Sequence, residues 1–244
     1  MNHYVRRAAA VLLAATLIGA AACSAGEEAH PVVFAAASLT NPFADLAENA
    51  EVNVDYSFGG SNGLVDQLVG GAPADVFASA NTATMDRAVE EGVTAGEPVR
   101  FATNLLVLVT PAGNPAGITG LDESLDGAKL VICAPEVPCG AATAALAETV
   151  GITLEPVSEE SAVTDVLGKV TSGEADAGLV YATDAAGAGE DVETLEIPES
   201  SQHVNEYWIV AVKGGDADSA SSFIELVTAA AGQELLADFG FGPA

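Results

Sequence analysis

Two serine-bearing turns in this chain combine residue types that can hold an anion. The first follows the apolar run Val32–Phe34, where three alanines lead into Ser38-Leu39-Thr40-Asn41-Pro42. Ser, Thr and Asn cap helices, and Pro42, which has no N–H to donate, fits the first turn of a helix. The second turn is Phe58-Gly59-Gly60-Ser61-Asn62-Gly63. A strand, a tight turn and a helix N-terminus would present free backbone N–H groups and a hydroxyl, which predicts an anion site.

Each of these polar residues also has a simpler interpretation. A serine in front of a helix is more often only a helix cap, so one such turn does not establish an anion site. An exported hydrolase with Ser38 or Ser61 as its nucleophile is the alternative from another class, but it needs a base. His30 lies in the predicted tether and His203 stands in no recognisable catalytic context, so we expect no catalytic residues. Asp75 has no partner base in the sequence, and we expect it to cap or brace a turn.

Short apolar runs alternate with helical patterns along the chain. This alternation predicts an α/β fold with a mostly parallel sheet and helical crossovers. Ligands in such sheets bind beyond the carboxyl ends of the strands, where Ser38 and Ser61 both fall. The predicted strands are Val32–Phe34, Val52–Ser57, Ala74–Ala78, Leu105–Val109, Leu130–Cys133, Gly178–Tyr181 and Tyr207–Val212. The predicted helices follow Ser38 and Ser61, span Thr84–Glu91 and Ala141–Thr149, open near Ser158–Ser161, and close the chain at Phe223–Leu236.

Together with Ala72–Ser79, the two serine turns resemble a known family, the molybdate-binding proteins that serve ATP-binding-cassette importers. The resemblance extends from Val32 to Phe241. It implies a two-lobed periplasmic-binding-protein-like fold of type II, with each lobe a mostly parallel sheet flanked by helices and the ligand in the cleft. The implied lobe 1 comprises 31–103 plus 208–244, and the implied lobe 2 comprises 104–207.

The resemblance also implies a ligand set drawn from both lobes. Lobe 1 would supply the hydroxyl and N–H groups of Ser38 and Ser61. Lobe 2 would supply backbone N–H groups at Cys139 and Val163 and the phenol of Tyr181. All of these groups are donors, which suits a tetrahedral dianion that offers only acceptors. Helix N-termini would add partial positive charge without a mobile Lys or Arg.

The function that the resemblance implies is the capture of molybdate, and of tungstate, for delivery to the membrane subunits of an importer. The binding partner is then a small oxyanion, no cofactor is needed, and a monomer is expected. Because donors come from both lobes, binding and lobe closure would stabilise each other. A receptor for another tetrahedral oxyanion, such as sulfate or phosphate, is the alternative.

The N-terminus has the pattern of a targeting segment. Arg6 and Arg7 precede an apolar stretch at 8–19, too short to span a bilayer by itself, and small residues lead into Cys23. This pattern is similar to the lipobox of bacterial lipoproteins and predicts a signal peptide at 1–22, a lipid on Cys23 and a tether at 23–30. The protein would then be exported and anchored to the outer face of the cell membrane, or periplasmic. An ordinary secretory signal with an incidental cysteine is the alternative.

Two further cysteines, Cys133 and Cys139, are separated by five residues. An exported protein with one close cysteine pair is expected to oxidise it to a disulfide. A metal site is the alternative, but zinc needs four clustered ligands and the three histidines of the chain are scattered.

The composition excludes one class of partner. The formal net charge is −28, from 35 acidic and 7 basic residues, so the phosphates of a nucleic acid would be repelled. Half of the 244 residues are hydrophobic, enough for the core of one large domain or two of ordinary size.

Overall fold

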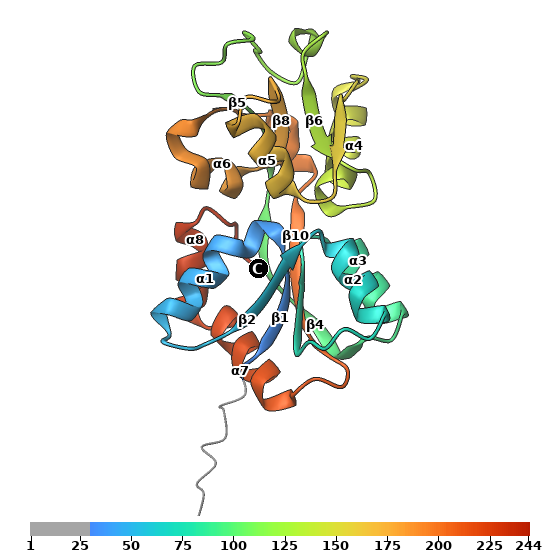
Figure 1. The fold of residues 1–244 in the computed structure, drawn as a ribbon, viewed down its shortest axis with the longest axis vertical. Coiled ribbons are helices and arrows are strands. Elements are labelled where there is room, and N and C mark those ends of the chain that lie inside the picture. Colours follow the sequence, from blue (N-terminus) through green and yellow to red (C-terminus); the bar gives the residue numbers. More distant parts are fainter. Residues whose placement is uncertain (1–29) are drawn as a thin grey trace, which may run out of the picture.

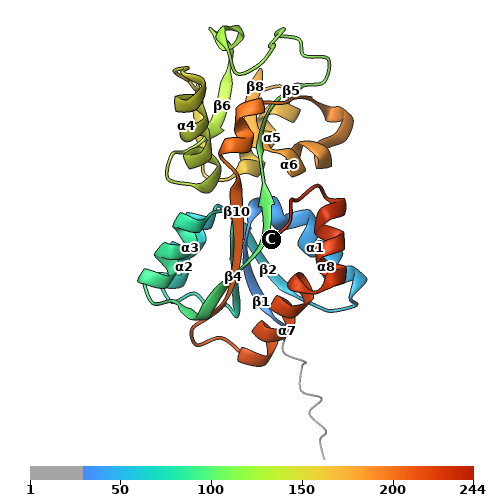
Figure 2. The ribbon, with the colours of Figure 1, turned by 180° about the vertical axis from the view of Figure 1, so that it is seen from behind.

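The computed structural model describes residues 30–244, which form two lobes stacked along the long axis of the molecule (Figure 1). The predicted signal peptide, the lipidation site at Cys23 and the tether up to residue 29 lie outside the described residues. Each lobe contains a five-stranded sheet with helices on both faces (Figures 1 and 2). Within residues 30–244, no helix is long and apolar enough to cross a membrane.

The sheet of the first lobe has the strand order β2-β1-β3-β10-β4. Its strands are β1 (Val32–Ala36), β2 (Asp55–Gly59), β3 (Val76–Ser79), β4 (Thr94–Asn104) and β10 (Asn205–Val212). Its helices are the short 3₁₀ helix η1 (Ala37–Leu39), α1 (Thr40–Asn49), α2 (Ser61–Val69), α3 (Thr82–Glu90), α7 (Ala217–Thr228) and α8 (Ala230–Asp238). Residues from both ends of the described chain therefore build this lobe.

The sheet of the second lobe has the strand order β7-β6-β8-β5-β9. Its strands are β5 (Leu106–Pro111), β6 (Leu130–Cys133), β7 (Ser158–Glu160), β8 (Ala177–Tyr181) and β9 (Val192–Leu195). Its helices are α4 (Pro138–Val150), α5 (Val163–Thr171), α6 (Ala182–Ala188) and the short 3₁₀ helices η2 (Glu123–Leu125), η3 (Gly189–Asp191) and η4 (Pro198–Gln202). The lobe boundaries that the resemblance implies remain a prediction.

The predicted fold class, a two-lobed α/β protein, is confirmed, but the expectation of mostly parallel sheets is wrong, because both sheets are mixed. In each sheet, two of the four strand pairings are parallel and two are antiparallel. The antiparallel pairings are those of β5 and β10, the strands that follow the two crossings between the lobes. These strands enter their sheets from the other lobe and not through a helical crossover, which is the connection that makes neighbouring strands parallel.

Three local predictions differ from the structure. The helix predicted to open near Ser158–Ser161 is present as α5 but begins only at Val163, and Ser158–Glu160 form a short edge strand before it. The single closing helix predicted at Phe223–Leu236 is two helices, α7 and α8, because Ala229 adopts an extended conformation. A Cβ at Gly232 of α8 would lie 2.2 Å from the Leu226 carbonyl oxygen, so this glycine permits the close packing of the two helices. Strand β4 was not predicted, because its first half is largely exposed and lacks an apolar run.

The apolar face of α1 attaches the first serine turn to the sheet. Its buried residues include Phe43 and Leu46 at helical spacing. The Phe43 ring packs edge-on against Phe223 of α7, with ring centroids 5.4 Å apart. Burial of such a side chain contributes about 1.5–3 kcal/mol, which holds the turn that precedes α1 in place.

Asp75 has the structural role that was expected of it. Its Oδ2 accepts a hydrogen bond from the Val32 N–H at 2.7 Å, and its Oδ1 accepts one from the Asp216 N–H at 2.6 Å. The carboxylate therefore ties the start of β1 to the start of α7, at the end of the sheet opposite the serine turns.

Candidate functional site

A small cavity lies between the two lobes and contains all five predicted ligand residues in its wall. Its volume is about 20 Å³, on a scale where one water molecule needs roughly 10–15 Å³. The space therefore suits one compact species and not a sugar or an amino acid. Its walls are formed by Ala36, Ala37, Ser38, Gly59, Gly60, Ser61 and Ala80 from the first lobe and by Val137, Pro138, Cys139, Ser161, Ala162, Val163 and Tyr181 from the second.

Helix N-termini from both lobes converge on this cavity. The first lobe contributes the η1–α1 segment and α2, and the second contributes α4 and α5. The residues before these helices, Ala36, Gly60, Val137 and Ala162, provide no side-chain cap. By contrast, α7 begins away from the cavity and is capped by the side chain of the preceding residue, Asp216. The first N–H groups of a helix have no partner within it, so the cavity is lined by donors that await an acceptor.

Cys139 and Val163 hold the positions that this geometry requires. Cys139 is the second residue of α4, and Val163 is the first residue of α5. Their N–H groups therefore belong to the unpaired set at each helix start. Both side chains are buried, so only the backbone faces the cavity as a polar group.

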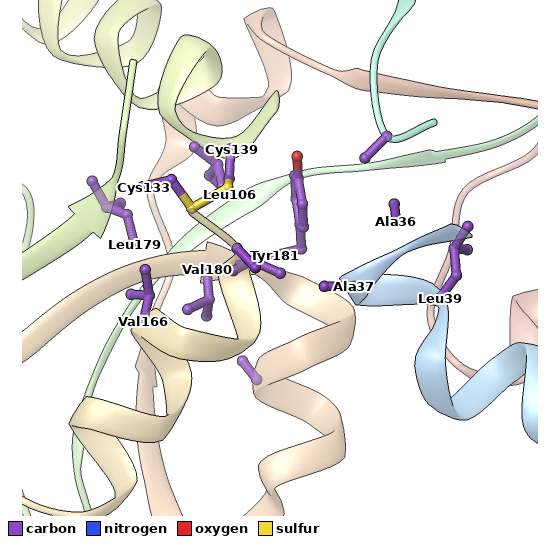
Figure 3. Packing of buried hydrophobic residues seen from close by; sticks show 14 of the residues in the cluster. Ala36, Ala37, Leu39, Leu106, Cys133, Cys139, Val166, Leu179, Val180 and Tyr181 are labelled. Atoms are coloured by element: carbon purple, nitrogen blue, oxygen red, sulfur yellow. A yellow bond between two sulfur atoms is a disulfide. The ribbon is translucent and has the colours of Figure 1, made fainter. Parts of the chain in front are cut away.

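The wall also contains the hydroxyl-bearing residues Ser38, Ser61, Ser161 and Tyr181, three of which belong to the predicted ligand set. The Ser61 Oγ accepts a hydrogen bond from the Ala80 N–H at 3.2 Å, which leaves its own proton free. The Ser38 Oγ lies 2.9 Å from the Tyr207 hydroxyl oxygen. The Tyr181 hydroxyl oxygen accepts from the Asn205 side-chain amide at 2.9 Å. Tyr181 itself lies between the disulfide of the second lobe and the turn at Ala36 and Ala37 (Figure 3).

The electrostatics of the site depend on dipoles and not on charged side chains. The cavity wall, which belongs entirely to the described residues, includes no Lys, Arg, His, Asp or Glu. Burial, together with the nearby Tyr207 and Asp184, holds the pKa of Tyr181 well above its ordinary value, so this phenol keeps its proton and remains a donor. Desolvation raises the pKa of the neighbouring Asp184 to about 7, opposed by a hydrogen bond from the Tyr181 N–H. Near neutral pH this carboxyl is therefore only partly charged, which limits its repulsion of an anion.

The two lobes touch each other beside the cavity. A Cβ atom at Gly60 would lie 2.0 Å from the Ser161 carbonyl oxygen, so the approach of the lobes requires a glycine here. The Asn62 side-chain amide donates to the Glu136 carbonyl oxygen across the cleft. The Asn62 Oδ1 in turn accepts from the Thr84 hydroxyl at 2.7 Å, which orients the amide. The two lobes are therefore in direct contact on this side of the cavity.

The predicted disulfide between Cys133 and Cys139 is confirmed. It joins the end of β6 to the first turn of α4, whose N-terminus faces the cavity (Figure 3). The side chain of Cys139 therefore forms the disulfide. Its backbone N–H, in the first turn of α4, stays available to bind an anion in the cavity. Within residues 30–244, no group of His, Cys, Asp and Glu has an arrangement that could hold a metal ion.

We expect reduction of this disulfide to affect both stability and ligand binding. Closing a short loop stabilises a protein at the lower end of the usual range, about 2 kcal/mol. The bridge also fixes the start of α4, so Cys133→Ser with Cys139→Ser should melt at lower temperature and bind the ligand more weakly. Intact-mass measurement after alkylation checks the bridge itself, and two labelled thiols in the native, non-reduced protein would contradict it.

In the described residues, neither serine of the hydrolase alternative has a general base as its hydrogen-bond partner. The run Gly59–Gly63 has the Gly-x-Ser-x-Gly spacing of a nucleophile elbow and joins a strand to a helix. However, the partner of Ser61 is a backbone N–H and not an imidazole. His203 is engaged elsewhere, with its Nε2 2.6 Å from the Thr149 hydroxyl oxygen. The Ser61 hydroxyl is therefore placed as a hydrogen-bond donor.

Tyr207 and Asn205 are polar neighbours of the site that sequence reasoning missed. Both are buried and lie on β10, and each contacts a hydroxyl of the predicted ligand set. The one available signal was a tyrosine at the start of a largely apolar strand. Gly60 was noted only as part of a turn, because its contact with the second lobe cannot be read from the local sequence.

Comparison with known families places this geometry in context. Residues 31–242 match the family model described as bacterial extracellular solute-binding protein. The chain belongs to this family. The molybdate-binding protein ModA of Mycobacterium tuberculosis is 48% identical over 217 residues, a match that covers 86% of this chain and 83% of that protein.

Solved structures of solute-binding proteins share the same fold. The periplasmic molybdate-binding protein of Azotobacter vinelandii aligns with a TM-score of 0.78 at 20% identity, over 88% of this chain and 100% of that one. The sulfate-binding protein SubI of M. tuberculosis aligns with a TM-score of 0.69 at 19% identity, over 88% and 87% of the two chains. These relatives are named as binding proteins and not as enzymes.

Proposed function

We propose that this solute-binding protein captures molybdate, and also tungstate, and delivers it to the membrane subunits of an ATP-binding-cassette importer. One observation carries the proposal: a small cavity between the lobes whose polar lining consists of donors at helix N-termini and hydroxyl groups, without a charged side chain. A tetrahedral dianion is the complement of such a lining, because it offers acceptors on every side. The 48% identity to a protein named for molybdate binding supports this choice among oxyanions.

In this proposal each lobe holds one side of the anion. The hydroxyl and N–H groups of Ser38 and Ser61 bind from the first lobe. The N–H groups of Cys139 and Val163 and the phenol of Tyr181 bind from the second. The anion then bridges the lobes and stabilises the closed arrangement, which is the state that an importer would recognise.

The cellular context is part of the same proposal. The pattern at 1–23 supports export and a lipid on Cys23, with a tether at 23–30. The protein would act as a monomer on the outer face of the membrane. The lobes would comprise 31–103 plus 208–244 and 104–207. No cofactor is required, because the proposed ligand is itself the transported solute.

A calorimetric titration of the purified protein with molybdate, tungstate, sulfate and phosphate tests the proposed function. We expect saturable binding of molybdate and tungstate with one site per chain. Tighter binding of sulfate would assign the protein to another oxyanion. Absence of heat with all four anions would reject the anion site.

Removal of either serine hydroxyl should weaken molybdate binding without unfolding the protein. A hydrogen bond to a charged group contributes about 1.5–3 kcal/mol, so Ser38→Ala and Ser61→Ala should each lower the affinity by roughly 10- to 150-fold. Ser221→Ala, at an exposed position on α7, is the matched control and should bind as the parent does. Unchanged titration curves for both cavity variants would remove these hydroxyls from the site.

A further inference from the structure

Asn205 occupies a position that links the two halves of the site. It is the first residue of β10, where the chain returns from the second lobe, and its side chain is buried. The Asn205 Nδ2 donates to the Ala80 carbonyl oxygen of the first lobe at 3.0 Å and to the Tyr181 hydroxyl oxygen of the second at 2.9 Å. The N–H of the same Ala80 donates to the Ser61 Oγ. A continuous hydrogen-bonded path therefore runs from Ser61 to Tyr181.

The orientation of the Asn205 amide follows from its partners. A carbonyl oxygen can only accept, so the amide nitrogen and not the amide oxygen must face Ala80. Because the nitrogen carries only donors, the Tyr181 oxygen must accept in this pair. The single proton of the Tyr181 hydroxyl is then left for the neighbouring Tyr207 side chain, with which it also hydrogen-bonds, or for an anion in the cavity. Without Asn205, this hydroxyl could rotate and direct its lone pairs at an anion.

The cost of retaining this amide indicates that its donors matter. The Asn205 Oδ1 is buried and has no hydrogen-bond partner among the described residues. A leucine of similar shape would avoid the unpaired oxygen, so a purely packing role would not favour asparagine. The two N–H bonds are what distinguishes the amide from an apolar side chain.

We propose that Asn205 is a positioning residue that fixes the Tyr181 hydroxyl as a donor to the bound oxyanion. It acts through Tyr181 and does not itself line the cavity. Asn205 hydrogen-bonds to both lobes. It therefore orients the Tyr181 hydroxyl in the same arrangement of the lobes that places Ser61 and Tyr181 around one cavity. This role rests on the proposed function, because it assumes that Tyr181 contacts an anion.

A double-mutant cycle on the full chain separates this role from a structural one. Molybdate is titrated into the parent protein, Asn205→Leu, Tyr181→Phe and the double variant. We expect each single variant to lose about tenfold or more in affinity, and the double variant to match Tyr181→Phe within about twofold. Asn49→Leu makes the same chemical change at an exposed position of α1 and should leave the affinity unaltered.

The outcomes of this cycle are distinguishable. Losses that multiply in the double variant would show that Asn205 acts independently of Tyr181 and would overturn the positioning role. A parent protein that binds none of the four oxyanions would overturn the proposed function, and this role with it. Thermal unfolding without ligand shows whether Asn205→Leu folds. If it does not, the cycle is repeated with Asn205→Ala, and the affinity of the double variant is again compared with that of Tyr181→Phe.

Discussion

Replacing Gly60 with alanine is expected to reduce molybdate affinity by about 100-fold or more. The backbone at Gly60 has φ −61° and ψ 129°, which alanine adopts readily, so each lobe should fold normally. The added Cβ would lie 2.0 Å from the Ser161 carbonyl oxygen in the closed arrangement, so the lobes must separate. Separation by even 1 Å takes the donors of one lobe out of hydrogen-bonding range, about 2.7–3.2 Å. Loss of two bonds to a charged ligand, at about 1.5–3 kcal/mol each, gives the expected magnitude.

Gly63→Ala is the matched control for this substitution. Gly63 lies three residues further along, in α2, and a Cβ there would meet nothing within 4 Å. Its variant should bind molybdate as the parent does and be slightly more stable, because alanine favours a helix over glycine. Calorimetry measures the affinities, and small-angle scattering with and without molybdate measures closure. Parent-like affinity in Gly60→Ala would show that the closed contact is not needed for binding.

Phosphate is expected to be excluded even though it resembles molybdate in shape. Near neutral pH phosphate carries a proton, and the buried hydroxyl would face a lining made of donors. A buried polar group without a partner costs on the order of 1–3 kcal/mol, and the affected donor of the protein is left unpaired as well. We therefore expect phosphate to compete at least about 100-fold less well than molybdate at pH 7. Sulfate is fully deprotonated and escapes this penalty. Comparing sulfate with molybdate therefore tests selection by size alone.

Stopped-flow binding of molybdate across a salt series, with phosphate and sulfate as competitors, also shows how the anion approaches the protein. Five of the seven basic residues follow the predicted signal peptide, against 35 acidic ones, and none of them lines the cavity. Arg87, Arg100 and Lys169 are each paired with a carboxylate. Added salt should therefore screen the repulsion and raise the association rate in stopped-flow measurements. Phosphate that competes as well as molybdate would show that an acceptor lines the site.

Much of the fold followed from local patterns. The run Val32–Phe34 and the first-turn proline Pro42 were sufficient to predict β1 and the start of α1, because burial and capping are short-range effects. Cys139 and Val163 could be proposed as backbone donors only through a family resemblance. A backbone N–H leaves no mark on the residue type, so neither position has a chemical signal of its own.

The features that could not be predicted depend on contacts between distant segments. The close approach at Gly60 exists only because Ser161, about a hundred residues away in the chain, lies opposite it. Asn205 gains its partners from Ala80, which directly follows β3, and from Tyr181 at the end of β8. The break at Ala229 carries no glycine or proline at that position, and arises where α7 and α8 pack together.

The two crossings between the lobes lie side by side. β4 ends at Asn104 and β5 begins at Leu106, and the return crossing enters β10 at Asn205. Because β4 and β10 are hydrogen-bonded neighbours, with Asn104 opposite Asn205, the crossings define one short line between the lobes (Figure 2). Rotation about that line changes few backbone torsions, whereas twisting one lobe against the other would disrupt the pairing of β4 with β10. We therefore expect spin-label distances across the cleft to vary together along a single correlated series. Capture of the solute would then require rotation of the lobes about one hinge axis. The lobes would not have to sample all the relative orientations that two flexibly linked domains can adopt.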